Sequence, residues 1–400
     1  MTATKGKRAT SAGDRALRLL GGEVVEPPVC MQMYLGLYLA APRKRAREQV
    51  YREILGQRQE LELSYDEVLE AELAAWERAW ALFRRPPAWL PMQISVSRAG
   101  AEGARVFADG ERVLYEEARG GPVDLSAPHD PAHRDVWDRR TEQPGKLDPE
   151  ELVPTFEAPD ALIADQRDAT RRALQRWGER HLLHTSIGTP YWACYSALGF
   201  AGMMETMRGD LALLLAIIER TLHNLLQRVK VVAASGLKCL FVEECLSSSD
   251  LISEADYLEF CHPFTRELLQ AARDAGLRTV YYFCGGIEDR LEHLAALPAD
   301  ALAFEESKKG FVIDLGQVRG AVGPERPLLG NLDATVLRDG DAEAIRRAVG
   351  EQYRQAGPLL AMSCGSPVTL DTPPEKVDGL VEATAGCGLR TSDLRPRTTD

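Results

Sequence analysis

The sequence predicts a single (β/α)8 barrel with its active site at the C-terminal ends of the strands. Short apolar, β-rich runs alternate with longer helical stretches, as in a parallel sheet with crossover helices. Eight such runs can be identified, and eight is the strand count of this barrel. The main alternative is an open doubly wound sheet. No Gly-rich dinucleotide fingerprint follows any of the runs, which disfavours that fold.

The expected strands come at irregular intervals along the chain, and most are followed by a helical stretch. They are residues 28–34, 91–97, 182–187, 238–244, 278–284, 300–304, 327–331 and 358–364. The run at 253–276 has helical, amphipathic spacing, and comparable stretches follow the later strands. The repeated order of strand and helix therefore predicts one barrel over 15–390.

Residues 40–160 interrupt this alternation. Residues 42–87 have a charged, helical pattern, whereas 99–160 is rich in Gly, Pro, Asp and Arg. We interpret 40–160 as an irregular insertion or lid on the barrel. At the ends of the chain, we expect 1–14 to be a disordered lead-in and 391–400 to be a tail.

Composition excludes several classes of function. The 400 residues are 45% hydrophobic and carry a formal charge of -12, which argues against broad nucleic-acid binding. No run approaches the roughly 18 uninterrupted apolar residues of a membrane span. The eight cysteines are scattered, several within apolar runs, which is typical of free thiols in a reducing compartment. We expect a cytoplasmic protein with no membrane partner. The oligomeric state stays open, and a dimer is compatible with the sequence.

Polar side chains gather where the expected strands end. They are Glu243, Glu244, Cys284, Glu305, Glu306, Asn331 and Cys364. In a barrel these ends share one face, where active sites are built. The alternative is that individual members cap the following helix or lie in solvated loops. We favour a functional site for the set.

Cys284 and Cys364 are the pair in this set that points most clearly to a particular chemistry. Two thiolates with a carboxylate or a histidine suit zinc, and Glu306 lies on the strand end between them, where it could complete such a site. A zinc with an open position can hold a bound thiol as a nucleophilic thiolate. The alternative is two buried free cysteines.

Aromatic and histidine residues give weaker signals. Tyr191, Trp192 and Tyr195 follow one strand and could form a pocket wall for substrate, although core packing explains them equally well. His129 and His133 lie in a Pro/Asp-rich segment that favours solvated loop positions. Gln32, at the end of the first strand, is a further substrate-binding candidate.

Five motifs in order resemble the uroporphyrinogen decarboxylase superfamily. They are GTPYWACYSALGFAGMMETMRGD, LISEADYLEFCHPFTREL, YYFCGGIEDRL, GNLDATVL and SCGSPVTLDTPPEKVDGLVEA. They cover about 180–386, and RALRLLGGEVVEPPVCMQM is similar to the family's opening segment. The resemblance implies the same barrel and the same strand-end site.

The resemblance to true decarboxylases fails where their chemistry is expected. Their opening segment carries arginines for substrate carboxylates, but 31–37 has none, and Cys364 stands where they have histidine. The cysteine pattern resembles the methylcobamide:thiol methyltransferase branch and, more remotely, cobalamin-independent methionine synthase. That resemblance implies zinc on Cys284 and Cys364, with Glu306 as a carboxylate ligand. Tyr282 takes the family's histidine position, where a neutral phenol is a poor ligand.

We therefore expect a zinc-dependent transferase that moves a methyl or small alkyl group to or from a small-molecule thiol. Glu243 or Glu244 would position the substrate, with Tyr282 and Asn331 as further catalytic candidates. The donor would be a small molecule or a corrinoid on a partner protein, because no Asp-x-His-x-x-Gly cobalamin motif is present.

Two alternatives remain open. One is a metal-free lyase or decarboxylase acting on a different small carboxylate. Such an enzyme needs an arginine from 99–160 to reach the pocket, and the candidates are Arg105, Arg112, Arg134 and Arg139. The other is a non-catalytic binding subunit that retains the barrel.

Overall fold

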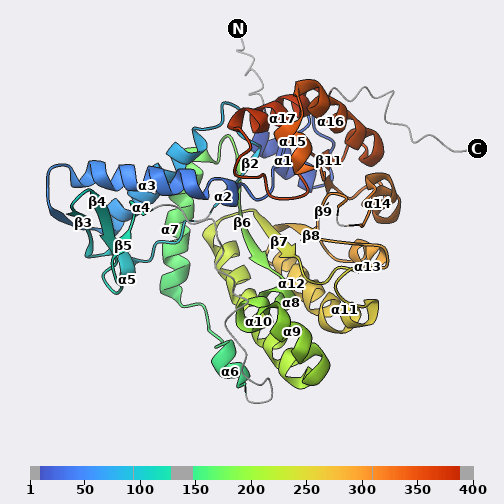
Figure 1. Ribbon diagram of the computed structural model, residues 1–400, viewed down its shortest axis with the longest axis horizontal. Coiled ribbons are helices and arrows are strands. Elements are labelled where there is room, and N and C mark those ends of the chain that lie inside the picture. The colour runs from blue at the N-terminus through green and yellow to red at the C-terminus, as the bar shows by residue number, and fades with distance from the viewer. Residues whose placement is uncertain (1–9, 93, 128–146, 309, 388–400) are drawn as a thin grey trace, which may run out of the picture.

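A parallel sheet of seven strands forms the centre of the protein. The computed structural model describes residues 10–92, 94–127, 147–308 and 310–387. The strands follow the order β11-β10-β9-β8-β7-β6-β2 (Figure 1). Their bounds are β2 Trp89–Pro91, β6 Leu182–Gly188, β7 Cys239–Glu244, β8 Arg278–Phe283, β9 Ala301–Phe304, β10 Leu328–Leu329 and β11 Leu360–Ala361.

Residues 29–31 close this sheet into a barrel. On one side Met31 N donates to Met362 O at 2.8 Å, and Met362 N donates to Val29 O at 3.0 Å. On the other side Ala88 N donates to Cys30 O at 2.7 Å. The segment thus occupies the eighth strand position between β11 and β2. The predicted (β/α)8 fold is confirmed.

Alternate residues of each strand face the barrel interior. Phe241, Val280 and Tyr282 belong to the inner cluster of buried side chains, whereas Leu240, Val242 and Tyr281 belong to the cluster beneath the helices. In the interior Trp89 stacks on His184 with ring centroids 4.0 Å apart. Burial lowers the pKa of His184 to about 3, so its imidazole is a neutral packing group.

Helices surround the strands, and most of them lie in the connections from one strand to the next. Among the described residues, the longer ones are α1 Ala12–Leu20, α7 Asp160–Trp177, α9 Tyr195–Gly209, α10 Leu211–Ser235, α11 Glu254–Phe260, α12 His262–Asp274, α14 Leu315–Val322, α16 Ala342–Ala356 and α17 Pro374–Gly386. Shorter ones are α2 Leu35–Tyr38, α6 Pro149–Leu152, α8 Pro190–Ala193, α13 Leu291–Ala295 and α15 Ala334–Asp339. Within the described ranges, no helix has the length and apolar character needed to cross a membrane.

Two boundaries differ from expectation. A capping box between Ser11 and Asp14 starts α1 at Ala12, so the end of the expected lead-in is helical. The second strand spans Trp89–Pro91 rather than 91–97, because pairing with β6 ends at His184. Residues 1–9 and the expected tail 391–400 lie outside the described residues.

The insertion contains regular structure where an irregular insertion or lid was expected. Helices α3 Ala40–Leu55 and α4 Tyr65–Trp80 pack with an antiparallel sheet of order β1-β3-β4-β5, and α5 Arg98–Ala101 precedes β3. The strands are β1 Glu60–Leu63, β3 Ala104–Asp109, β4 Arg112–Glu116 and β5 Val123–Asp124. Figure 1 shows this unit to one side of the barrel, with α7 between them.

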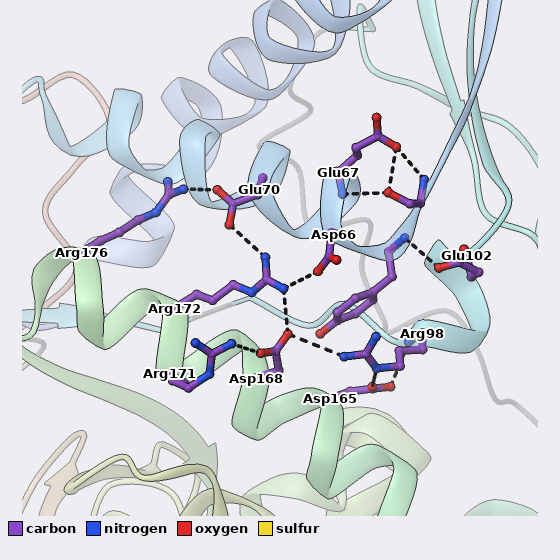
Figure 2. A network of polar contacts seen from close by, with 12 residues as sticks. Asp66, Glu67, Glu70, Arg98, Glu102, Asp165, Asp168, Arg171, Arg172 and Arg176 are labelled. Carbon is purple, nitrogen blue, oxygen red and sulfur yellow. Dashed lines mark hydrogen bonds and ion pairs between the residues drawn. The ribbon is translucent and has the colours of Figure 1, made fainter.

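Charged side chains join the insertion to α7. Arg172 of α7 forms ion pairs with Asp66, Glu70 and Asp168, and Arg176 forms one with Glu70 (Figure 2). These side chains satisfy one another, so they fix the position of the insertion rather than offer charges to a ligand.

Candidate active site at the barrel mouth

Four polar side chains share the inner face at the ends of β7 and β8. Glu243 lies opposite Tyr282 in the register, and Glu244 lies opposite Phe283. The next residues, Cys245 and Cys284, continue this pairing, because Cys284 N donates to Glu244 O at 2.9 Å. Since alternate residues face the same side, Glu243, Cys245, Tyr282 and Cys284 all point inward. Both cysteines pack against the inner cluster.

The loop after β9 brings a carboxylate to this group. The Cys284 thiol donates to Glu305 Oε2 at 3.1 Å. Glu305 forms an ion pair with Lys308, which also hydrogen-bonds Ser366. A thiol therefore donates directly to a carboxylate whose charge a lysine balances.

Two tyrosines form the floor beneath these groups. The Tyr34 ring packs edge-on against Tyr282 and Phe241, with centroids 5.3 and 5.7 Å away. The Tyr282 hydroxyl donates to Gly365 O at 2.7 Å. Burial raises the pKa of both phenols well above the usual value, so they stay neutral. Tyr282 therefore serves as a packing and hydrogen-bonding group at this point.

Glu243 is the carboxylate suited to proton transfer. Removal from water raises its pKa to about 7. Both protonation states are then populated near neutral pH, which suits a general acid or base. Its neighbour Tyr282 stays neutral, so Glu243 is the titrating group on this part of the wall.

Glu244, one residue further, lies on the opposite face of β7. It is fully buried and accepts hydrogen bonds from Thr189 Oγ1 and, at 2.8 Å, from Leu246 N. Burial raises its pKa to about 7, and the hydrogen bonds act against that rise. Its surroundings include Tyr191, Tyr257 and Cys261, all beneath the helices. Glu244 therefore stabilises the end of β7 on the side of the helices and does not face the barrel mouth.

Cys364 also belongs to the outer cluster. It is fully buried, in the same cluster as Cys30 and Met362. Burial raises its pKa well above the usual value, and nearby Cys30 and Glu306 add to the effect. Glu306 is itself buried and forms an ion pair with Lys308 at 3.3 Å. Glu306 therefore lies near Cys364, whereas Cys284 packs against the inner cluster.

Gln32 and Asn331 hold the mouth together through the backbone. Gln32 Oε1 accepts from Cys364 N at 3.0 Å, and its Nε2 donates to Met33 O at 3.0 Å. Asn331 Nδ2 donates to Glu305 O at 3.2 Å. Their side-chain groups are engaged, so both support the loops that position the site.

The three aromatic residues expected to line a substrate pocket lie in different surroundings. Tyr191 is fully buried, and its hydroxyl lies 3.9 Å from Met207 Sδ in the outer layer. The Trp192 ring packs directly on Gly188, because a Cβ atom added to Gly188 would lie 2.1 Å from Trp192 Cε3. Gly188 ends β6 on its inner face, which places Trp192 near the mouth. Tyr195 is partly exposed at the start of α9.

The donor set expected for zinc is not assembled. Cys284 faces the interior, whereas Cys364 lies in the outer layer, and the Tyr282 hydroxyl is committed to Gly365. Over the described ranges, no group of three or more His, Cys, Asp and Glu side chains could hold a metal ion. We therefore assign no catalytic step to a metal at this site.

Sequence reasoning missed Tyr34, Cys245 and Lys308. Cys245 was detectable, because it keeps the same inward spacing of two as Phe241 and Glu243. Tyr34 and Lys308 lie beyond the strand ends, where loop conformation decides direction and no periodicity applies. His129, His133, Arg134 and Arg139 lie outside the described residues.

A separate cavity of about 460 Å³ lies behind β6, between α7 and α10. Apolar side chains such as Ile94, Leu162 and Val231 line it, together with Arg228. None of the strand-end residues described above lines this cavity, so it is distinct from the barrel mouth.

The arginines proposed for carboxylate binding are also engaged elsewhere. Arg105 pairs with Glu60 and Glu116, and Arg112 pairs with Asp109 on the insertion sheet. Both are about half-exposed and belong to the unit beside the barrel. They contribute no cation to the barrel mouth.

Comparisons with known proteins agree with this architecture. The family model described as "Uroporphyrinogen decarboxylase (URO-D)" matches residues 95–386. A methyltransferase from Methanosarcina mazei has the same fold, with a TM-score of 0.61 at 16% identity, over 94% of this chain and 98% of that one.

Curated relatives are more limited in extent. The uroporphyrinogen decarboxylase of Chlorobium phaeovibrioides is 32% identical over 34% of this chain and 39% of that protein. That of Gloeobacter violaceus is 22% identical over 54% of this chain and 62% of that protein. The chain thus matches between about two-fifths and three-fifths of the length of these relatives. Because the family model matches residues 95–386, the chain belongs to the uroporphyrinogen decarboxylase family, which is a family of enzymes.

Proposed function

We propose that the protein transfers a methyl or small alkyl group to or from the thiol of a small molecule at the mouth of the barrel. The observation that carries this proposal is the hydrogen bond from Cys284 to Glu305 among buried groups that include Glu243. Carboxylates beside a thiol site can remove the proton that a thiol must lose before its sulfur attacks carbon.

The reaction needs a proton acceptor close to the sulfur. In the forward direction the substrate sulfur forms a bond to the alkyl carbon, the bond from that carbon to the donor breaks, and the thiol proton leaves. Glu243 can accept this proton because its pKa is about 7. Cys284 and Glu305 line the place where sulfur would sit, and the tyrosine floor keeps water out from below.

The barrel mouth is poorly suited to a substrate with many carboxylates. Burying a carboxylate without a partner costs on the order of several kcal/mol. The segment 31–39 supplies no arginine. Lys308 is already shared between Glu305 and Glu306. A polycarboxylate would therefore find acidic groups where it needs cations.

The shared fold of the Methanosarcina mazei methyltransferase is consistent with this proposal. A lyase acting on a different small carboxylate is the second candidate, because the curated relatives are uroporphyrinogen decarboxylases. In that reaction Glu243 in its protonated form would supply a proton to the carbanion, and Lys308 would have to leave a glutamate to bind substrate.

The two candidates are separated by product analysis. Purified protein is incubated with methylcobalamin and a panel of small thiols, and separately with uroporphyrinogen. Thioether formation that depends on Cys284 supports the transferase. Porphyrinogen decarboxylation without any thioether rules it out in favour of the lyase. Methylcobalamin also tests a corrinoid as donor, which a partner protein would carry.

Zinc remains a prediction from the resemblance, and metal analysis tests it directly. One outcome is that the protein binds about one zinc ion per chain and that Cys364→Ala loses it. This outcome would mean that the expected ligands Cys284, Glu306 and Cys364 rearrange to bind the ion together. Zinc that is absent from active protein would rule out the zinc-dependent form of the reaction.

A further inference from the structure

Cys245 and Cys284 lie beside each other at the ends of the neighbouring strands β7 and β8. They follow the register pair Glu244 and Phe283, and the hydrogen bond from Cys284 N to Glu244 O continues the ladder to this point. Neighbouring strands lie about 4.8 Å apart. Disulfide-bonded cysteines have Cα atoms roughly 4.4–6.8 Å apart. The backbone therefore already has the separation that a disulfide needs.

The side chains also meet. Both cysteines pack against the inner cluster, so their thiols lie on the same face of the two neighbouring strands. The neighbouring Cys284 thiol and burial raise the pKa of Cys245 well above its usual value. The Cys284 thiol donates to Glu305 Oε2 at 3.1 Å. A chain of thiol, thiol and carboxylate thus runs across the mouth.

Accessibility separates this pair from most other cysteines. Cys30, Cys194, Cys239, Cys261 and Cys364 are buried, whereas Cys245, Cys284 and Cys387 are partly exposed. Cys387 ends α17, in the outer cluster rather than at the mouth. It provides a natural control for a thiol that is accessible but has no cysteine beside it at the strand ends.

We infer that Cys245 and Cys284 form a reversible intramolecular disulfide, which makes the barrel mouth a site of thiol oxidation. The oxidant is a hydroperoxide or a low-molecular-weight disulfide, the usual oxidants of protein thiols. Neither cysteine has to leave its strand end for the bond to form.

With hydrogen peroxide the chemistry proceeds in two balanced steps. Cys284 gives its proton to Glu305, and its sulfur attacks peroxide: an S–O bond forms, the O–O bond breaks, and water leaves after taking up that proton. Cys245 sulfur then attacks the sulfenic sulfur: the S–S bond forms and the S–O bond breaks. The hydroxide takes up the Cys245 proton and leaves as a second water. The two thiols lose two electrons and the peroxide gains them.

The disulfide has a consequence for the site that rests on the proposed function. It would remove the thiol that donates to Glu305 and tie two walls of the mouth together. Alkyl transfer would stop on oxidation and return with a dithiol reductant, because exposed disulfides at strand ends are accessible to thiol exchange. The chemical test below does not depend on any activity.

Peptide mapping under native conditions tests the inference. Folded protein is treated with increasing hydrogen peroxide, free thiols are blocked with N-ethylmaleimide, and the digest is analysed by mass spectrometry. We expect a linked peptide pair containing Cys245 and Cys284, a loss of two thiols per chain, and full recovery with dithiothreitol. Cys387→Ser should leave the linked pair unchanged.

Two results would overturn the inference. One is that Cys245 and Cys284 both remain free at peroxide concentrations that have oxidised Cys387. The other is that Cys284 oxidises to sulfinic acid while Cys245 stays free. In Cys245→Ser, the linked peptide must disappear and Cys284 should trap as a sulfenic acid. The mapping of the unmodified protein stays decisive even if that variant folds poorly. A disulfide without thioether formation in the reduced protein would leave this inference standing and remove the proposed function alone.

Discussion

The two faces of the same strand ends differ in chemistry although their residues are adjacent in sequence. On the inner face, Glu243, Cys245 and Cys284 lie near Glu305 and Lys308. On the outer face, Glu244 and Cys364 are sealed under helices among apolar and aromatic side chains. A position at the C-terminal end of a strand therefore does not suffice to place a residue in the site. The direction of the side chain, set by its spacing along the strand, decides.

A raised pKa has different consequences on the two faces. Glu243 and Glu244 both reach about 7 through burial, yet only Glu243 faces the mouth. The shift in Glu244 is a property of a buried structural carboxylate, whose hydrogen bonds hold Thr189 and Leu246. A perturbed pKa by itself thus does not identify the catalytic group.

The largest effect is expected for Glu243→Gln. Glutamine cannot accept the thiol proton, so the transfer rate should fall about 100-fold, the size typical of a lost general base. In the unmodified protein the rate should rise with pH through about 7, as Glu243 ionises. The variant should lose that rise. A kcat profile from pH 5.5 to 8.5 measures both, and a variant that keeps the rise would assign the base to another group.

Glu244→Gln should act on stability and on its pH dependence. The pKa of about 7 in the folded protein lies above the usual glutamate value of 4.5, so ionisation is disfavoured in the fold and stability falls as pH rises from about 4.5 to above 7. This difference in the pKa of Glu244 between the folded and unfolded states lowers the stability by on the order of 3 kcal/mol at pH 8. The variant should be less pH-sensitive in urea unfolding, with transfer activity little changed. Equal slopes for both proteins would contradict this assignment.

A smaller effect is expected at the junction of the insertion and α7. Arg172 has three acidic partners, but the pairs are partly solvated and contribute at most about 1 kcal/mol each. Arg172→Ala should therefore lower the free energy of unfolding by about 1–2 kcal/mol, less at high salt. Arg171→Ala, which removes one exposed pair with Asp168, is the matched control. Equal losses in the two variants would mean that the network does not hold the insertion in place.

The barrel was predictable because its signal is repeated. Seven of the eight expected runs coincide with strands or with the closing segment 29–31, each carrying apolar residues on both faces, as buried parallel strands do. The second strand was displaced because only Trp89–Pro91 pairs with β6. The insertion sheet was missed because β3 and β4 carry Arg105 and Arg112 on an exposed face, which made the segment read as loop.

The site was predictable to the level of the strand ends and no further. Glu243 and Cys284 were identified together with Glu244 and Cys364, because residue type and strand end do not reveal direction. Counting in twos from Phe241 and Val280, both in the inner cluster, gives Glu243, Cys245, Tyr282 and Cys284. The same count cannot cross into loops, so the turn that brings Lys308 back to Glu305 had no sequence signal.

The proposed reaction centre lies on the inner face around Cys284. It is tested most directly by the rate of methyl transfer to a small thiol in Cys284→Ala and Cys364→Ala, measured side by side with folding verified by circular dichroism. We expect a loss of about 30-fold for Cys284→Ala and a change within about 3-fold for Cys364→Ala, since only the first substitution alters the barrel mouth. A large loss in Cys364→Ala with Cys284→Ala still active would contradict it.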